Sequence, residues 1–263
     1  QGSTITGLDD AAANINSGNA TVAQVNTVSG VTSGTTTATI SDNDMSTLNG
    51  ITGTGNAYTI SVQDASVDAA ELNALDAKTT VAVGVTSSTI TGAVADVKIA
   101  YAAQGATISG LGDKNVTLND SSIAATDINS VNGSTSGTVT VQATTVTGAA
   151  GDLVTAYAAQ GSGVDGLGNE AVTVNSGTAS VAQVNTLASA TSGTLTASVT
   201  EGDMSTLAGI TESGNALTVT VTDSSVDAAA LNTLDGKTTV AVAVTSTTIT
   251  GAASDVNASY AAK

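Results

Sequence analysis

Residues 216–239 are ALTVTVTDSSVDAAALNTLDGKTT, and this stretch decides the fold that we expect for the whole chain. Its first part alternates apolar and polar side chains, with Leu217, Val219 and Val221 on one face and threonines between them. Alternation of this kind predicts a half-buried strand. A serine, threonine or aspartate follows the strand, and a short helical segment comes next. The stretch therefore predicts a strand and a short helix in sequence.

The helical part of the pattern is clearest in residues 160–193, QGSGVDGLGNEAVTVNSGTASVAQVNTLASATSG. Val181, Val184 and Leu187 recur at the spacing that places side chains on one face of a helix. An apolar stripe of this width indicates a helix that packs on a core with one side.

Signals for the start and the end of these helices surround the apolar stripe. SVAQ at 180–183 and TVAQ at 21–24 match the capping box, in which a hydroxyl and a glutamine satisfy free amides at a helix start. The triplet TSG follows the stripe in three places, and we expect its glycine to end the helix at Gly34, Gly137 and Gly193.

The whole chain repeats at a shift of 159 positions, where residues 160–262 lie over residues 1–103 without a gap. Roughly six positions in ten are identical, and VAQVNT, DMSTL, SVDAA and KTTVAV occur in both copies. A full copy contains four kinds of sub-repeat, which in the last copy are residues 160–193, 194–215, 216–239 and 240–263. A shortened copy at 104–159 contains only the first and the fourth kind, so the chain has ten sub-repeats in all.

A strand, a helix and another strand in succession predict parallel strands with right-handed crossovers. Sub-repeats that resemble one another stack in register, so we predict an α/β repeat solenoid of about ten coils, each with a parallel strand and a short helix. Residues 1–263 would form one continuous solenoid with its strands in one long sheet. An all-β parallel β-helix is the alternative, and the capping boxes favour the α/β form.

Both ends of the chain lie at the same phase of the repeat. The chain begins with QGSTITG and ends with SYAAK, while internal junctions are YAAQGATISG and YAAQGSGVDG. We therefore expect the sequence to be a stretch of a longer array.

Composition narrows the range of partners. The 22 acidic residues outweigh five lysines and give a net charge of −17. Nucleic acid and anionic membrane surfaces are excluded, because phosphate binding needs clustered cationic side chains. No apolar run reaches the length of a membrane span, so membrane insertion is not expected. The chain has no cysteine and 2% aromatic residues, so the predicted core consists of Val, Ile, Leu and Ala.

Residue types also argue against catalysis. The chain lacks histidine, cysteine and arginine, which excludes a nucleophile paired with an imidazole and leaves only scattered lysines to stabilise an anion. We expect no enzymatic activity and no catalytic residues.

Acidic residues in turns are the candidates for metal binding. Asp42 and Asp44 lie in SDND, and Glu201 and Asp203 lie in TEGD at the matching place. Calcium binds several carboxylate and carbonyl oxygens at once, so these four residues are our candidate calcium ligands. Neither an EF-hand loop nor the glycine-rich nonapeptide of β-rolls occurs. The alternative role for these carboxylates is helix N-capping. We expect no other cofactor.

Threonine also follows the repeat. We expect outward-facing threonines on the strands, at Thr138, Thr140, Thr194, Thr196, Thr218 and Thr220. Flat threonine ranks are what ice-binding solenoids present to water. The alternative is that threonine is a soluble residue with a preference for strands, and alanines interrupt the ranks.

An asparagine follows an apolar residue in several helical segments, at Asn26, Asn73, Asn129, Asn185 and Asn232. Stacked asparagines form hydrogen-bonded ladders in some solenoids. The alternative, which we favour, is that they lie on the exposed face of the helices.

The segments GLGNEAVTVNSGTASVAQVNTL, SVDAAALNTLDGKTT and TITGAASDVNASYAA resemble tandem repeats of giant, acidic, Thr/Ala-rich secreted or cell-surface proteins of marine cyanobacteria. Such proteins are often labelled haemolysin-type or calcium-binding. The resemblance covers essentially the whole chain, although the haemolysin-type nonapeptide is missing. It implies an extracellular or cell-surface location and a structural or adhesive role.

These observations predict a structural extracellular protein that forms a rod or filament, such as a surface layer, a fibre or the stalk of a giant adhesin. The expected partner is the protein itself, through head-to-tail stacking or through continuation of the same array. The alternatives are a calcium-dependent adhesion module and, after it, an ice-binding protein.

Overall fold

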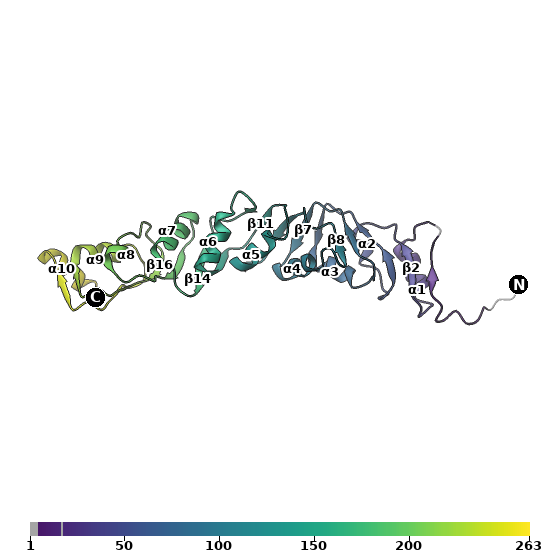
Figure 1. Ribbon diagram of the computed structural model, residues 1–263, viewed down its shortest axis with the longest axis horizontal. Helices are drawn as coiled ribbons and strands as arrows, with labels where there is room; N and C mark the ends of the chain where they lie inside the picture. The colour runs from purple at the N-terminus through teal and green to yellow at the C-terminus, as the bar shows by residue number, and fades with distance from the viewer. Residues whose placement is uncertain (1–4, 17) are drawn as a thin grey trace. The chain divides into compact units, whose positions relative to one another are not determined.

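The computed structural model describes residues 5–16 and 18–263. In this part of the chain, ten short helices alternate with parallel strands, and each sub-repeat contributes one helix (Figure 1). The expected α/β class and the alternation of strand and helix are confirmed, and the all-β alternative is wrong. The helices are α1 (Val22–Ser29), α2 (Met45–Leu48), α3 (Ala69–Asp76), α4 (Val94–Ala102), α5 (Ala125–Asn132), α6 (Ala150–Ala158), α7 (Val181–Ala190), α8 (Met204–Leu207), α9 (Ala228–Asp235) and α10 (Ala253–Ala261).

The chain divides into two compact bodies. The first comprises Gln1–Asp120 and Val131–Thr140, and the second comprises Ser121–Ser130 and Val141–Lys263.

Strands of three parallel sheets form the first body, and α2, α3 and α4 pack against one another in chain order. Val67, Ile90 and Val116 are register partners on adjacent strands and are all buried, so neighbouring sub-repeats place matching apolar residues in one row. Grouped by sheet, its strands up to Asp120 are β1 (Ala13–Asn14), β2 (Thr36–Thr39) and β3 (Ala57–Thr59); β4 (Ser61–Val62), β6 (Val83–Val85) and β8 (Ile108–Ser109); and β5 (Ser66–Asp68), β7 (Thr89–Gly92) and β9 (Asn115–Leu118), which are three strands of a five-stranded sheet.

The second body follows the same plan, with α6 on α7 and with α8, α9 and α10 in succession. Its largest sheet is β10 (Ser122–Ala124), β12 (Thr145–Ala149), β14 (Ala171–Ser176), β15 (Leu195–Ser198) and β16 (Ala216–Thr218). Two strand pairs complete it, β17 (Thr220–Val221) with β19 (Ala243–Val244) and β18 (Ser225–Asp227) with β20 (Thr248–Thr250). The remaining short strands are β11 (Val139–Val141) and β13 (Val164–Asp165).

The strands form several small sheets, and the single long sheet that we expected is wrong. Each sub-repeat turns between short strands, as between β4 and β5, where Gln63 and Asp64 interrupt the extended chain. This turn brings the Asp64 carboxylate to the start of α2 in the preceding sub-repeat, where its oxygen lies 2.8 Å from the amide nitrogen of Met45.

The predicted inward and outward faces are confirmed. Leu217, Val219 and Val221 are buried, and the threonines between them are exposed. Val181, Val184 and Leu187 are likewise the buried residues of α7. Small aliphatic side chains thus fill the space between strands and helices, as the shortage of aromatic residues requires.

Both predicted capping boxes are present. At the start of α1, the amide of Gln24 donates to Thr21 Oγ1 over 3.3 Å, and the amide of Thr21 donates to Gln24 Oε1 over 2.8 Å. Ser180 and Gln183 make the same reciprocal pair at the start of α7. Two otherwise free amides are satisfied at each helix start.

Candidate functional site

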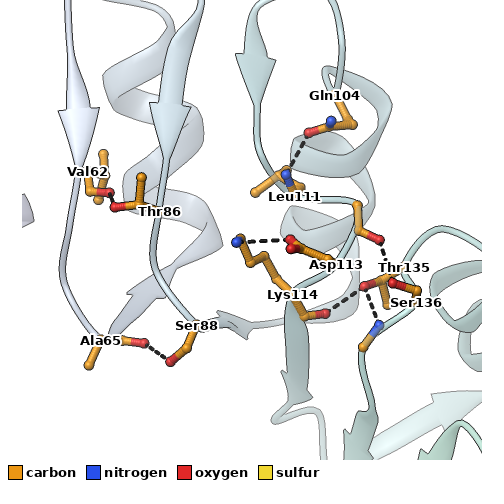
Figure 2. A network of polar contacts seen from close by, with 12 residues as sticks. Val62, Ala65, Thr86, Ser88, Gln104, Leu111, Asp113, Lys114, Thr135 and Ser136 are labelled. Atoms are coloured by element: carbon orange, nitrogen blue, oxygen red, sulfur yellow. Dashed lines mark hydrogen bonds and ion pairs between the residues drawn. The ribbon is translucent and has the colours of Figure 1, made fainter.

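The feature that recurs through the molecule is a set of polar contacts between consecutive sub-repeats. Figure 2 shows several of them in the first body: Thr86 Oγ1 donates to the carbonyl of Val62 over 3.1 Å, and Ser88 Oγ donates to the carbonyl of Ala65 over 2.7 Å. Both bonds run from the turn between β6 and β7 to the preceding sub-repeat, where Val62 ends β4 and Ala65 lies in the turn that follows. These hydroxyl groups therefore add side-chain hydrogen bonds to the backbone hydrogen bonds that join consecutive sub-repeats.

The TSG triplet forms the most regular of these contacts. Thr135 Oγ1 donates to the carbonyl of Lys114 over 2.6 Å and accepts from the amide of Gly137 over 3.0 Å (Figure 2). The amide of Ser136 donates to the carbonyl of Gly112 over 2.9 Å. Thr32 and Thr191 make the same bond, to the carbonyls of Ala11 and Glu170, over 2.6 and 2.7 Å. In all three places, the triplet therefore joins its sub-repeat to a loop of the preceding sub-repeat.

The glycine of the triplet does not end a helix, which corrects our expectation. The residues after α1 and α7 are Gly30 and Thr191. A Cβ atom on Gly34, Gly137 or Gly193 would overlap backbone atoms of Ala11, Lys114 or Glu170, in that order. None of the three has a positive φ. The triplet therefore needs glycine because two backbones approach closely, not because of a left-handed turn.

Lys114 adds an ion pair beside one triplet. Its Nζ atom lies 2.9 Å from Asp113 Oδ1, whose side chain is 73% exposed (Figure 2). The hydrogen bond to the ammonium group, and then its charge, lowers the pKa of Asp113 below its usual value. Water surrounds the aspartate, so the pair contributes little to stability.

In the second body, the position equivalent to Lys114 is occupied by Glu170, which is buried. Its Oε2 atom accepts from Tyr157 Oη and from the amide of Gly168, both over 2.8 Å, and Oε1 has no partner in the described part of the chain. Burial, and after it the bond to Glu170, raises the pKa of Tyr157 far above its usual value. The phenol therefore remains a neutral donor, and Glu170 depends on it.

Asp42 and Glu201, two of the candidate calcium ligands, occupy matching places at helix starts. Asp42 Oδ2 accepts from the amide of Val22 over 2.7 Å, and Glu201 Oε2 accepts from the amide of Val181 over 3.0 Å. These amides are the first of α1 and α7, in the preceding sub-repeat. Each carboxylate thus satisfies a free donor at the positive end of a neighbouring helix.

Asp44 and Asp203, the other two candidates, cap helices of their own sub-repeat. Asp44 Oδ1 accepts from the amide of Thr47 over 3.0 Å and from Ser46 Oγ over 2.6 Å at the start of α2. Asp203 makes the same contacts with Ser205 and Thr206 at α8. The serine hydroxyl first, and then bonds from the following threonine, lower the pKa of each carboxyl below 3.8.

N-capping therefore describes Asp44 and Asp203, whereas Asp42 and Glu201 accept from the first amide of a helix in the preceding sub-repeat. In the residues that the structure describes, no group of three or more acidic side chains is arranged to hold a metal ion.

Three further carboxylates bridge to the preceding sub-repeat, and sequence analysis missed them. Asp64, Asp120 and Asp223 accept from the first amides of α2, α4 and α8 over 2.8, 2.8 and 2.7 Å. The sequence signal was the recurrence of an acidic residue 19 to 26 positions after a helix start. That spacing has meaning only once the stacking of sub-repeats is known.

The recurring asparagines also join sub-repeats, so our preference for an exposed role is wrong. Asn26 Nδ2 donates to the carbonyl of Gly50 over 2.7 Å, and its Oδ1 accepts from the amide of Thr52 over 3.1 Å. Asn185 makes the same two bonds in the second body. The other three donate over 3.0 Å to a carbonyl of the next helix, from Asn73, Asn129 and Asn232.

The threonine ranks are exposed but short. Thr194, Thr196, Thr218 and Thr220 are exposed, and Thr138 and Thr140 are half-buried. In the sheet that runs from β10 to β16, Thr147, Thr173 and Thr196 are register partners, and Ala216 follows them. Three adjacent strands therefore share one row of threonines before an alanine interrupts it.

Comparison with known proteins identifies no relative: no family model, no curated protein and no solved structure matches the chain. None of the helices in the described residues has both the length and the apolar character needed to cross a membrane.

Proposed function

We propose that this chain is a structural protein, a right-handed α/β solenoid in which about ten coils stack to form part of a rod or filament. Its function would be mechanical: each coil buries its apolar face on its neighbours and presents an acidic, hydroxyl-rich surface to water.

The observation that carries the proposal is that polar contacts link consecutive sub-repeats and recur at separations of about one sub-repeat, from 19 to 26 residues. Bonds between sub-repeats join residues 20 apart at Val22 and Asp42, 24 apart at Asn26 and Gly50, and 24 apart again at Asn185 and Gly209. Contacts that reach only the adjacent sub-repeat are typical of solenoids and not of closed globular domains.

The shortened middle copy supports the same proposal. Residues 104–159 lack the second and third kinds of sub-repeat, yet Val146 pairs in register with Ile123 before it and Val172 after it. A closed core would lose essential contacts if two of four sub-repeats were removed. In a stack of similar coils, the sub-repeats on either side of the missing ones can pair with each other instead.

A secreted or cell-surface location, and the protein itself as partner, complete the proposal. The location rests on the resemblance to giant cyanobacterial repeat proteins. The net charge of −17 supports solubility and gives no surface for nucleic acid. A stalk or filament is a role in which length matters, and repetition of one coil is an economical way to set length.

The calcium-dependent alternative would use Asp42, Asp44, Glu201 and Asp203. All four already accept hydrogen bonds at helix starts, and we therefore place the structural function first. Melting curves with calcium and with a chelator separate the two. The structural proposal expects the same melting temperature in both, whereas a rise of several degrees with calcium would favour the alternative.

Deletion of whole sub-repeats tests the solenoid directly. Removing residues 194–239 joins a first-kind sub-repeat to a fourth-kind one, as in the natural middle copy. We expect a soluble chain with an unchanged circular dichroism spectrum per residue and a shorter maximum dimension in small-angle X-ray scattering. The control removes one and a half sub-repeats, residues 194–227, which joins Gly193 directly to the start of α9 without the strands before it, and is expected to unfold. Unfolding of the in-phase variant would contradict the proposal.

A further inference from the structure

We propose that Asn49 and Gly50 form a site of spontaneous deamidation that folded α2 masks, and that the reaction there breaks a contact between two sub-repeats. The dipeptide Asn-Gly occurs at 49–50 and at 132–133 in the sequence. At 49–50 it follows the short helix α2 and takes part in the contact that Asn26 makes with the next sub-repeat. The inference concerns covalent modification of the chain and does not depend on the proposed structural function.

The reaction needs no reactant other than water. The backbone nitrogen of Gly50 attacks the side-chain carbonyl carbon of Asn49, a five-membered succinimide ring forms, and the side-chain nitrogen leaves as ammonia. Water then opens the ring at one of its two carbonyl carbons and gives aspartate or isoaspartate. Glycine favours the attack, because it has no side chain and its backbone adopts many conformations.

The conformation at the end of α2 masks this dipeptide. Asn49 is exposed to water, but its backbone is helical, with φ −59° and ψ −20°. A helical ψ turns the Gly50 nitrogen away from the Asn49 side chain, so the ring closes only after the backbone changes conformation. The same nitrogen must lose its proton to attack, and in the folded chain that N–H group donates to the carbonyl of Thr47 over 2.9 Å.

The helix that masks the site is held by few contacts. α2 has four residues, so it makes few hydrogen bonds of its own. Its start depends on Asp44, which accepts from the amide of Thr47, and on Asp64 of the next sub-repeat, which accepts from the amide of Met45 over 2.8 Å. Such a segment opens locally without unfolding of the whole chain, and each opening allows the reaction.

The product no longer fits the contact between the sub-repeats. Asn26 Nδ2 donates to the carbonyl of Gly50 over 2.7 Å, and Asn26 Oδ1 accepts from the amide of Thr52 over 3.1 Å. Isoaspartate at position 49 adds one methylene group to the backbone directly before Gly50, which displaces that carbonyl relative to Thr52. It also places a negative charge at the C-terminal end of α2, where the helix dipole is negative. The reaction is irreversible, so it records that the sub-repeat has opened.

The second body contains the same contact without the reactive residue. Asn185 donates to the carbonyl of Gly209 over 2.7 Å and accepts from the amide of Thr211 over 3.1 Å. Ala208 stands where the first body has Asn49, and the amide of Gly209 donates to the carbonyl of Thr206 over 2.9 Å. The contact is therefore made equally well with alanine, and the second body provides a control inside the same chain.

The first test compares the full chain in buffer and in urea, at one mildly alkaline pH at which the backbone amide loses its proton more readily. Peptide mapping by mass spectrometry locates each modified asparagine and distinguishes isoaspartate from aspartate. We expect Asn49 to react about tenfold faster or more in urea, because the folded state reacts only during local opening. Equal rates in buffer and in urea, or an Asn49 that does not react in urea, would overturn the masked site.

The second test changes how often α2 opens. Asp64→Ala removes the acceptor of its first amide, and we expect faster deamidation of Asn49 in buffer and an unchanged rate in urea. Asp223→Ala makes the same change at α8 in the second body and should leave the rate at Asn49 unchanged in both solvents. Circular dichroism establishes that each variant is folded. The same rate in buffer for both variants would contradict masking by α2.

The third test measures the effect of the product on the contact with Asn26. Chains with isoaspartate at position 49 are separated by chromatography, and hydrogen exchange is followed in the segment that contains the amide of Thr52. Asn49→Asp introduces the charge without the extra methylene group, and Asn49→Ala reproduces the arrangement of the second body. We expect the fastest exchange with isoaspartate and parent-like exchange with Asn49→Ala. Equal exchange in the isoaspartate chain and Asn49→Asp would show that the lengthened backbone does not break the contact.

Discussion

Gly193 shows how a single residue sets the distance between two sub-repeats. Its φ is not positive, and yet no other residue fits, because a Cβ atom would overlap the carbonyl oxygen of Glu170. Thr191 in the same triplet donates to that same carbonyl over 2.7 Å. The threonine draws the strands together, and the glycine allows the approach.

We expect Gly193→Ala to lower the free energy of unfolding by about 2 kcal/mol or more, because the backbones must separate to admit the methyl group. Gly151→Ala is the matched control in the same body, since a Cβ atom there meets nothing within 4 Å. Gly151 lies in α6, so its replacement should be neutral or stabilise by up to about 1 kcal/mol. Urea unfolding of both variants measures the difference, and equal effects would contradict the close approach.

Tyr157 is the residue on which a buried carboxylate depends. Replacing it by phenylalanine leaves Glu170 with only the amide of Gly168, and we expect a loss of about 2 kcal/mol, typical of a hydrogen bond to a charged group. Tyr101→Phe is the control, because that hydroxyl makes no hydrogen bond to a carboxylate. Denaturant titration at neutral pH compares the two, and a greater loss for Tyr101→Phe would refute this role.

The same tyrosine predicts a dependence on alkaline pH. Because burial and Glu170 raise the folded-state pKa of Tyr157 above 10.0, the folded state keeps the proton where the unfolded state releases it. The stabilisation is therefore complete below about pH 10 and is lost as the pH rises from there toward the folded-state pKa. Melting temperature against pH should fall less steeply above pH 10 in Tyr157→Phe than in the parent.

At the scale of elements, the starts of α1, α2, α7 and α8 are each completed from two directions. α8 has Asp203 of its own sub-repeat as N-cap, and Asp223 of the next sub-repeat accepts from its first amide. A helix of four residues has few bonds of its own, so these two carboxylates matter more here than at a long helix.

We expect Asp223→Ala to cost about 1 kcal/mol, because it removes a carboxylate from the positive end of α8 and frees the amide of Met204. Glu212→Ala removes the same charge from an exposed residue of that sub-repeat and should be close to neutral. Thermal unfolding at low salt compares the pair. Equal effects would mean that only net charge matters.

The sequence predicts those elements whose partners are local. The capping boxes at Thr21 and Ser180 close over three residues, so their signals could be recognised before any fold was known. The role of Asn26 could not, because its partners are 24 and 26 residues away, and a half-buried asparagine has the same local pattern as an exposed one. The glycine of TSG was misassigned for the same reason.

At the scale of the whole molecule, stability should depend on whether a sub-repeat has neighbours on both sides. α4 and α10 belong to the same kind of sub-repeat, but α4 buries Val97, Ala100 and Tyr101, whereas α10 buries nothing. Since helical stability comes mainly from tertiary packing, the two helices should differ although their sequences are related.

We expect the amides of α10 to exchange with deuterium faster than those of α4 in dilute solution, because local opening requires little loss of packing there. Hydrogen exchange followed by mass spectrometry measures both helices in one experiment. Equal protection of the two helices in dilute solution would contradict this uneven stability.

The bridging carboxylates also bear on how such a chain is made. The first amide of α1 finds its acceptor at Asp42, 20 residues later, and the first amide of α7 finds it at Glu201, again 20 residues later. During synthesis or export from the N-terminal end, the newest helix therefore stays incomplete until the following sub-repeat emerges. The same order holds for α2, α4 and α8, whose first amides find their acceptors 19 to 26 residues later. Folding of such helices therefore proceeds from the N-terminal end, about one sub-repeat at a time, because the acidic side chain that completes a helix lies in the following sub-repeat.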